Sequence, residues 1–286
     1  MIAFNGQYLP AASHGNMRIT AACLGGQWVM GGWLKTATQQ AIIAAFGAEE
    51  GIAVIIRTND YLNALALTDT TRAQQLAMFI NEDPLLVTSL VETSKERWLV
   101  GDGASYFNTG VTLRQANGST IKMKLQWQSF ATNGYQVNGW GNNPQIGISV
   151  TGGKAYWQNF ATGNQPLEVN KTYDVVLDLT QEKSVLHCDG FNDLVAGSVT
   201  TPNDYDFLVF CMTRNGIDRI NYANEKVGAV EVGSKHFLPY RDPSTGEMEL
   251  LDILTGTLAT RVGTFTEIIE NKYETHRTDT TRSGSR

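Results

Sequence analysis

The sequence is short of charge, of cysteine and of long apolar runs. Only 17 % of its 286 residues are charged, against a usual ~25 %. The net charge of −6 argues against a nucleic-acid partner, because phosphate-backbone binding needs clustered Lys and Arg. The three cysteines have no metal-ligand spacing, and their odd number cannot close as a complete disulfide framework. We expect no metal, no cofactor and a reducing assembly compartment.

No stretch reaches the ~18 consecutive apolar residues that cross a bilayer, and the first residues lack the basic and apolar regions of a signal peptide. We therefore expect a soluble protein that is made without a signal and does not insert into a membrane. Thr, Asn, Gln and the 28 glycines take the place of charge. This composition predicts an ordered, turn-rich and mainly β protein.

Residues 1–92 predict a small α+β module. A helix is expected up to Phe46, with Thr36 or Thr38 as its cap and Gly47 as its stop, and a second over residues 70–81 with Asp69 as its cap. Between them, the apolar run Ile52–Ile56 has the length of a strand. The module is too small to bury its apolar segments unaided, so we expect it to make the main protein–protein contact through Trp28-Val29-Met30, Trp33-Leu34 and Leu62–Leu67.

From about residue 95 the periodicity changes to two. Apolar and polar side chains alternate along Ile121–Gln128, and Tyr173–Leu179 alternates before the chain turns back into Ser184–Cys188. The run Tyr205–Met212 is apolar on almost both faces, as in an interior strand. These short strands, separated by Gly, Asn and Asp turns, predict two packed antiparallel sheets.

Several motifs in this region resemble one family. The opening run Trp98–Val111 contains Asn108-Thr109-Gly110, and the closing segments are Val227–Val232, Phe237–Arg241, Leu250–Gly256 and Gly263-Thr264-Phe265. They are similar to laminin-G-like, concanavalin A-like jelly-roll domains of phage, prophage and gut-bacterial surface proteins. Leu251 replaces the usual aromatic before Asp252. The resemblance covers about residues 95–268 and implies an antiparallel jelly-roll β-sandwich with lectin-like, adhesive or purely structural roles. We therefore expect this domain over residues 93–270, followed by a polar tail over 271–286.

The stretch Gln126–Pro166 is the candidate for glycan binding. It has one charged residue, Lys154, but seven aromatic residues interleaved with Asn and Gln. Sugar sites use aromatic faces for stacking and neutral amides for hydrogen bonds. We predict an exposed loop over residues 138–143, and the glycan-binding candidates are Trp140, Asn142, Asn143, Tyr135 and Asn138. The alternative is that the aromatic residues fill the sandwich core.

Catalysis is not expected. Glu247, Glu249 and Asp252 superficially resemble a glycosidase cluster, but they fall in the structural closing segments, and we expect no catalytic residue among them. His187 and Cys188 are neighbours on one strand, so their side chains point to opposite faces and cannot form a catalytic pair.

The function that fits best is a bacteriophage virion structural protein, a head or tail fibre or decoration subunit that is not an enzyme. We expect a homo-oligomer, assembled in the host cytoplasm, that binds other virion proteins through residues 1–92 and displays a jelly roll toward host surface polysaccharide. A bacterial surface glycan-binding protein is the first alternative. A glycoside hydrolase is the second.

Overall fold

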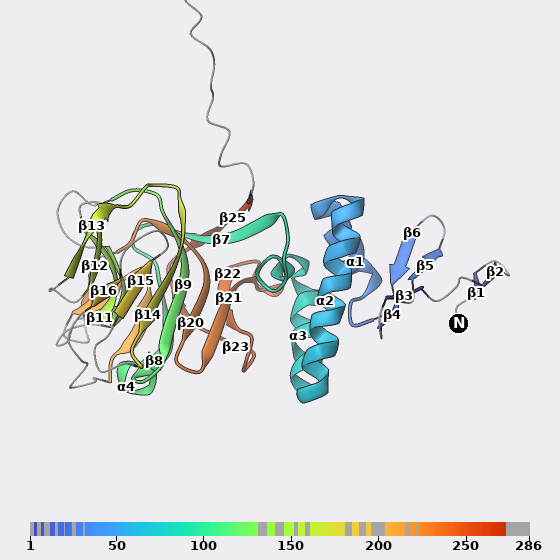
Figure 1. Cartoon of the computed structure of the whole chain (residues 1–286), viewed down its shortest axis with the longest axis horizontal. Coiled ribbons are helices and arrows are strands. Elements are labelled where there is room, and N and C mark those ends of the chain that lie inside the picture. The colour runs from blue at the N-terminus through green and yellow to red at the C-terminus, as the bar shows by residue number, and fades with distance from the viewer. Residues whose placement is uncertain are drawn as a thin grey trace, which may run out of the picture. The chain divides into compact units, whose positions relative to one another are not determined.

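A computed structural model gives the arrangement of the chain (Figure 1). The structure describes residues 3–4, 7–8, 12–14, 17–19, 21–24, 27–30, 32–130, 136–140, 146–151, 154–157, 161–180, 185–188, 193–195, 204–214, 218–220 and 222–272. The chain divides into two compact units, Met1–Arg97 with Ile269–Arg286, and Trp98–Ile268. We call them the helical unit and the β unit. The expected division after residue 92 lies a few residues before the observed one.

The helical unit contains α1 (Thr36–Phe46), α2 (Ala48–Thr68), α3 (Thr70–Glu82) and the 3-10 helix η1 (Pro84–Ser89). Gly47, with φ of 85°, separates α1 from α2. The side chain of Asp69 accepts a hydrogen bond from the Arg72 amide at 2.9 Å and caps α3. The two helices predicted from the sequence are confirmed, and so is the Asp69 cap. The cap predicted at Thr36 or Thr38 is wrong, because both residues lie inside α1, and Lys35, which precedes the helix, makes no side-chain capping hydrogen bond.

The strand predicted at Ile52–Ile56 is wrong, because these residues lie inside α2. Val54, Ile55 and Leu62 are fully buried at helical spacing, and Thr58 and Asn59 continue the same face. A short apolar run has the same appearance in a buried helix and in a strand. Only the longer pattern, which runs through Leu62, distinguishes the two.

Short antiparallel hairpins precede the helices. They pair β1 (Ala3–Phe4) with β2 (Gln7–Tyr8), β3 (Ala12–His14) with β4 (Met17–Ile19), and β5 (Ala21–Leu24) with β6 (Gln27–Met30). Leu24 pairs with Gln27 at the near ends of β5 and β6.

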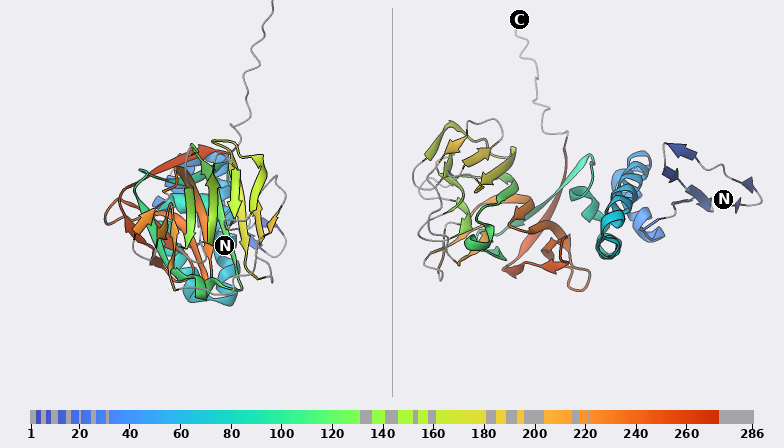
Figure 2. Two further views of the ribbon diagram at one scale, coloured as in Figure 1. Left: turned by 90° about the vertical axis from the view of Figure 1, so that its left-hand side faces the viewer. Right: turned by 60° about the horizontal axis from the view of Figure 1, so that its bottom comes forward.

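The β unit is built from antiparallel sheets, as a β-sandwich requires (Figure 2). Among the described residues, one sheet has the order β13 (Ala161–Pro166), β12 (Lys154–Trp157), β11 (Ile146–Thr151), β10 (Gln136–Trp140), β17 (Asp206–Val209), β8 (Tyr106–Thr112), β24 (Thr260–Val262). We call it the β10 sheet. Its neighbours β17 and β10, and β8 and β17, are far apart in the sequence.

The second sheet, the β20 sheet, has the order β16 (Leu194–Val195), β15 (Val185–Cys188), β14 (Thr172–Asp178), β9 (Thr120–Trp127), β20 (Glu225–Val232), β21 (Lys235–Arg241), β22 (Met248–Asp252), β23 (Thr257–Leu258). In addition, β7 (Lys95–Gly101) pairs with β20 and with β25 (Phe265–Asn271). Helix α4 (Leu113–Ala116) and the hairpin of β18 (Met212–Arg214) with β19 (Asp218–Ile220) complete the described elements. The expected tail over residues 271–286 begins inside β25, and residues 273–286 lie outside the described part.

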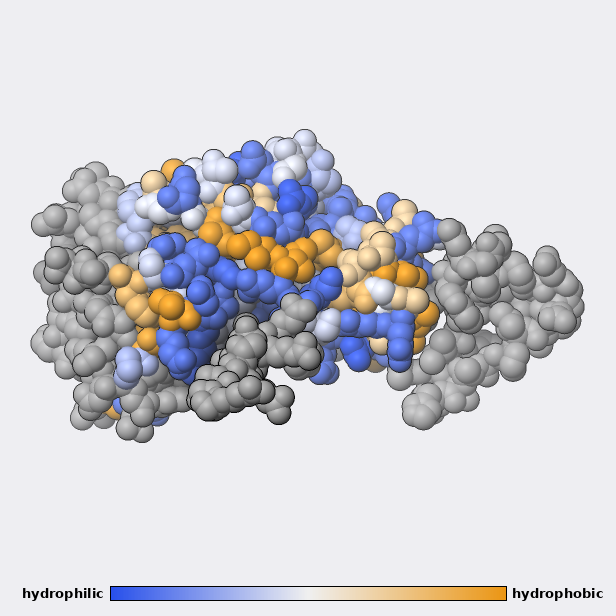
Figure 3. Space-filling model, turned by 90° about the horizontal axis from the view of Figure 1, so that it is seen from above, coloured by the Kyte–Doolittle hydropathy of each residue, from blue (hydrophilic) through white to orange (hydrophobic). Residues whose placement is uncertain are grey.

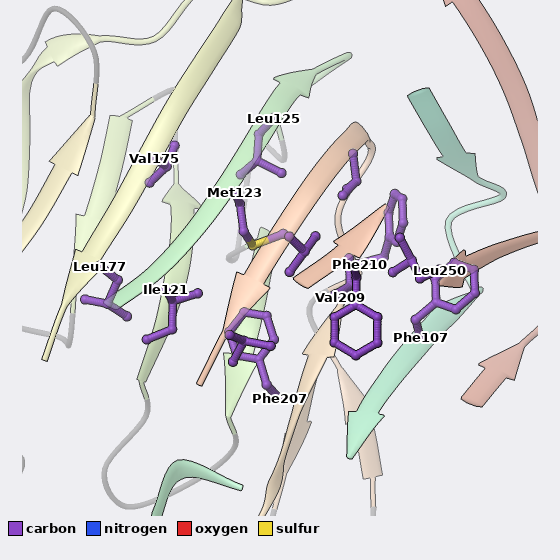
Figure 4. Packing of buried hydrophobic residues seen from close by; sticks show 14 of the residues in the cluster. Phe107, Ile121, Met123, Leu125, Val175, Leu177, Phe207, Val209, Phe210 and Leu250 are labelled. Atoms are coloured by element: carbon purple, nitrogen blue, oxygen red, sulfur yellow. The ribbon is translucent and has the colours of Figure 1, made fainter. Parts of the chain in front are cut away.

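The core lies between the two sheets and contains side chains from both (Figure 4). On β9, Ile121, Met123, Leu125 and Trp127 are buried, as the alternation predicts. Gln126 differs from the prediction, because it is buried between the flanking strands, where it pairs with Thr172 and Lys226. The two-residue period therefore identifies the core face correctly, but it does not identify what covers the opposite face.

The other strand predictions follow the same logic. Asp178 pairs with Val185, which confirms the hairpin of β14 and β15. The predicted interior strand at 205–212 is β17, which lies between β10 and β8 with Phe207 and Leu208 fully buried. It is shorter than predicted, because Phe210 takes a φ of 74° and ends the strand.

The opening and closing motifs of the β unit meet in space. Asp102 accepts hydrogen bonds from the amides of Ala104 and Ser105, and the Ser105 hydroxyl accepts one from the Thr264 amide at 2.8 Å. A Cβ on Gly263, where φ is 90°, would lie 2.0 Å from Ser105 Oγ. This close approach to Ser105 requires a residue without a side chain at position 263. It therefore explains the glycine of the Gly263-Thr264-Phe265 motif.

Candidate functional site

The glycan-binding candidates are distributed differently from the sequence expectation. Residues 136–140 are not a loop but strand β10, which is paired on both sides, with β11 and with β17. Tyr135, Asn142 and Asn143 lie outside the described residues, as does the side chain of Trp140. The prediction of an exposed loop beginning at Asn138 is therefore wrong, because these residues continue the sheet.

Asn138 itself is buried, with 1 % of its surface exposed. Its side-chain NH2 group donates to Glu225 Oε1 at 2.6 Å, and its side-chain oxygen accepts from the Phe210 amide at 2.6 Å. Both ends of the amide are thus used inside the protein. Asn138 has no exposed group for a sugar hydroxyl, so its assignment to the glycan site is corrected.

Asn138, Glu225 and Phe210 form a buried polar cluster that the sequence reading missed. Glu225 begins β20 opposite Trp127 of β9, and its carboxyl is completely enclosed. Burial raises the pKa of Glu225 to about 8, although the hydrogen bond from Asn138 acts to lower it. Glu225 lies two residues before buried Val227 on the same strand, so the alternation of side chains directs both to the inward face. This spacing is the sequence signal from which the burial of Glu225 could have been predicted.

The acidic residues of the closing segments are held by ion pairs and turns. Arg261 of β24 binds both glutamates, with Nη1 3.0 Å from Glu247 Oε2 and Nε 2.9 Å from Glu249 Oε1. Burial raises the pKa of Glu249, while the positive charge of Arg261 acts to lower it. A retaining glycosidase needs one carboxylate free to attack the sugar and another free to donate a proton. In this protein the guanidinium of Arg261 binds both the Glu247 and the Glu249 carboxylates.

Asp252 has a separate structural role. It is fully buried, and its Oδ1 accepts hydrogen bonds from the amides of His236 and Leu254, both at 3.1 Å. Its Oδ2 accepts a third from the Thr255 hydroxyl at 2.5 Å. Asp252 therefore fixes the turn that follows β22, which is a structural reason for the Asp and Thr of the closing motif.

The cysteine and histidine pattern gives no metal site within the described residues, which hold no group of three or more His, Cys, Asp or Glu side chains suited to a metal ion. Cys188 and Cys211 are buried, and neither forms a disulfide within the described part of the chain. His187 is half-buried, with Nδ1 2.6 Å from Asp193 Oδ1. Cys188 and His187 thus lie in different environments, as predicted for neighbours on one strand.

The helical unit has a surface pocket of about 590 Å³ where α2 begins. At its edge, the Glu50 carboxylate accepts hydrogen bonds from the amide and hydroxyl of Ser94, both at 2.6 Å. Burial acts to raise the pKa of Glu50, but the bonds to Ser94 and the charges of Lys95 and Arg57 outweigh it and lower the pKa. These hydrogen bonds and charges hold the Glu50 carboxylate in the pocket wall, and every group that takes part in them belongs to the helical unit.

Comparison of the chain with models of known protein families gives no match, and comparison with curated protein sequences gives no significant match either. In the part of the chain that the structure describes, no helix has the length and apolar character needed to span a membrane. The two units and their side chains therefore provide the observations on which a proposed function depends.

Proposed function

We propose that this chain is a structural subunit of a bacteriophage virion, a head or tail fibre or decoration protein that is not an enzyme. In this proposal the helical unit binds other virion proteins and further copies of the chain, and the β unit is a concanavalin A-like jelly roll directed toward host surface polysaccharide. The observation that carries the proposal is the division of the chain into two units with different chemistry. An attachment module and a display domain need that division.

The jelly-roll assignment is supported by the order of the strands. Adjacent strands β9 and β20, and β10 and β17, are separated by many residues along the chain. Greek-key connections produce such pairs, whereas a simple meander pairs only consecutive strands. The contacts among the opening and closing motifs give the same support, because they join segments at the two ends of the β unit.

The attachment role is supported by exposed apolar side chains. Of the described large hydrophobic residues, the two with the highest exposed fractions are Leu67 at 89 % on α2 and Met78 at 61 % on α3. Figure 3 shows patches of apolar residues among hydrophilic ones on one face of the described surface. Leu34 and Leu62, which were expected to stay exposed, are instead buried within the unit. Apolar side chains at the surface cost free energy in water, so a protein partner that covers them stabilises the assembly.

Substitution of the exposed residues tests this role. We expect Leu67→Asp with Met78→Asp to convert an oligomer of the full chain into 31.4 kDa monomers, read by native mass spectrometry. The matched control is Leu258→Asp, which changes a residue 44 % exposed on β23 and should leave the oligomer intact. A monomeric wild-type chain, or a double variant that stays oligomeric, contradicts self-association through the helices. Electron cryomicroscopy of the native particle then tests the virion location directly.

A further inference from the structure

The Glu225 carboxyl is buried, and only one of its two oxygens has a hydrogen-bond partner among the described residues. Oε1 accepts the 2.6 Å bond from Asn138, whereas Oε2 accepts none from the described part of the chain. Only 1 % of the residue is exposed. An ionised carboxylate in such a place loses its hydration and gains one neutral hydrogen bond in return, and this balance is strongly unfavourable. The neutral acid loses much less, because a buried hydroxyl without a partner costs far less than a buried charge.

The cluster connects the two sheets. Glu225 belongs to β20 of one sheet and Asn138 to β10 of the other. The side-chain oxygen of Asn138 also accepts a hydrogen bond from the Phe210 amide, and the Phe210 carbonyl accepts one from the Ala223 amide at 2.7 Å. Phe210 has a φ of 74°, a conformation that costs a non-glycine residue energy and needs support from its surroundings. The bond from Asn138 provides such support.

We propose that Glu225 is a proton-dependent latch between the two sheets: the neutral acid holds Asn138 and thereby β10, and loss of the proton opens this end of the sandwich. The open state lets water reach the carboxylate. The latch is closed at neutral and mildly acidic pH and is released as the solution becomes alkaline.

The surroundings of Glu225 contain no compensating positive charge among the described residues. Lys226 is the next residue of β20, so its side chain points to the opposite face of the sheet. On β9, Glu225 faces Trp127, and on β10 it faces Asn138, neither of which is charged. Two further buried titratable residues are Cys211, which follows Phe210 in the sequence, and Tyr173, whose ring centroid lies 5.5 Å from that of Trp127. Burial and the Asn138 bond alone set the pKa of Glu225 at about 8.

Hydrogen exchange of the full chain tests the latch. Because the carboxyl has a pKa of 4.5 when solvated and about 8 when enclosed, opening releases a proton throughout that interval. We expect the protection factors of the β10 amides, corrected for intrinsic exchange, to fall about tenfold per pH unit between about pH 5 and pH 8. In Glu225→Gln, which cannot ionise, they should stay constant over the same interval.

Glu231→Gln is the matched control. Glu231 lies on the same strand, but its carboxylate is partly exposed and pairs with Lys122 at 2.8 Å, so this variant should keep the wild-type pH profile. Equal pH profiles for wild type and Glu225→Gln would overturn the latch. If Glu225→Gln does not fold, carbon NMR of the wild-type carboxyl decides: a titration midpoint near 8 supports the proposal, and one near 4.5 refutes it.

Discussion

The helical unit and the β unit bury charged residues in different ways. In the helical unit, Arg97 is completely buried against Asp83, with Nη1 2.5 Å from Oδ2. In the β unit, Glu225 is equally buried but has a neutral amide as its partner. Opposite charges compensate each other over a wide pH range, whereas a lone carboxyl avoids a buried charge only by keeping its proton. The same degree of burial is therefore compensated by an opposite charge in the helical unit, whereas in the β unit it raises the pKa of the Glu225 carboxyl.

The largest expected effect comes from breaking the ion pair of the helical unit. Asp83→Asn removes the charge that compensates Arg97 and also weakens the cap on η1, where Asp83 accepts from the Leu85 amide. Leaving one member of a buried pair uncompensated costs about 3–5 kcal/mol. We expect exchange protection of α3 and η1 to fall strongly while that of β9 and β14 is kept. Equal loss in both units would show that the units do not unfold separately.

The next largest effect is expected in the β unit, where the opening and closing motifs meet. In Gly263→Ala the new methyl group would collide with Ser105 at a φ of 90°, and we expect a loss of about 2–4 kcal/mol. Gly103→Ala is the matched control, since its φ is 83° but no atom lies within 4 Å of the added Cβ. It should cost about 1 kcal/mol. Chemical unfolding followed by tryptophan fluorescence measures both, and similar losses would exclude the collision as the cause.

The core face of the β20 sheet and the cap at Asp69 could be predicted from the sequence, whereas the contact at Gly263 could not. The alternation along β9 and β14 identifies the core face of the β20 sheet, because strand side chains have a strict period of two. Asp69 is recognisable as a cap because its effect is local. The collision at Gly263 was not predictable from local sequence, since Ser105 lies 159 residues before Thr264, the next residue of the motif.

Asn138 and the Ile52–Ile56 run show two further limits. Asn138 stands before Gly139 in a polar, aromatic stretch, a pattern typical of a turn, yet strand pairing and Glu225 bury it. A local rule cannot include a partner on another sheet. Ile52–Ile56 was misassigned because five apolar residues fit a strand and a buried helix equally well. In both cases tertiary packing outweighs the local preference.

A smaller effect is expected at the pair of glutamates bound to Arg261. Glu247 is 42 % exposed at its side chain and Glu249 only 10 %, so Glu249→Gln should cost more than Glu247→Gln. We expect losses of about 1 kcal/mol or less, because partly exposed ion pairs contribute little. Neither variant should change function. A glycan-degrading activity in the wild type that falls by orders of magnitude in either variant would contradict the structural role and favour a glycosidase.

The smallest effect on stability, and the largest on binding, is expected for Trp140→Ala. The variant distinguishes a glycan-binding Trp140 from the alternative in which the aromatic residues fill the sandwich core. If Trp140 is a glycan platform, Trp140→Ala abolishes binding on a glycan array while the melting temperature stays close to that of the wild type. If Trp140 is a core residue, the same substitution costs about 3–5 kcal/mol of folding free energy and lowers the melting temperature strongly. Binding through neutral amides should also be nearly independent of salt, so a strong salt dependence would point to a charged ligand instead.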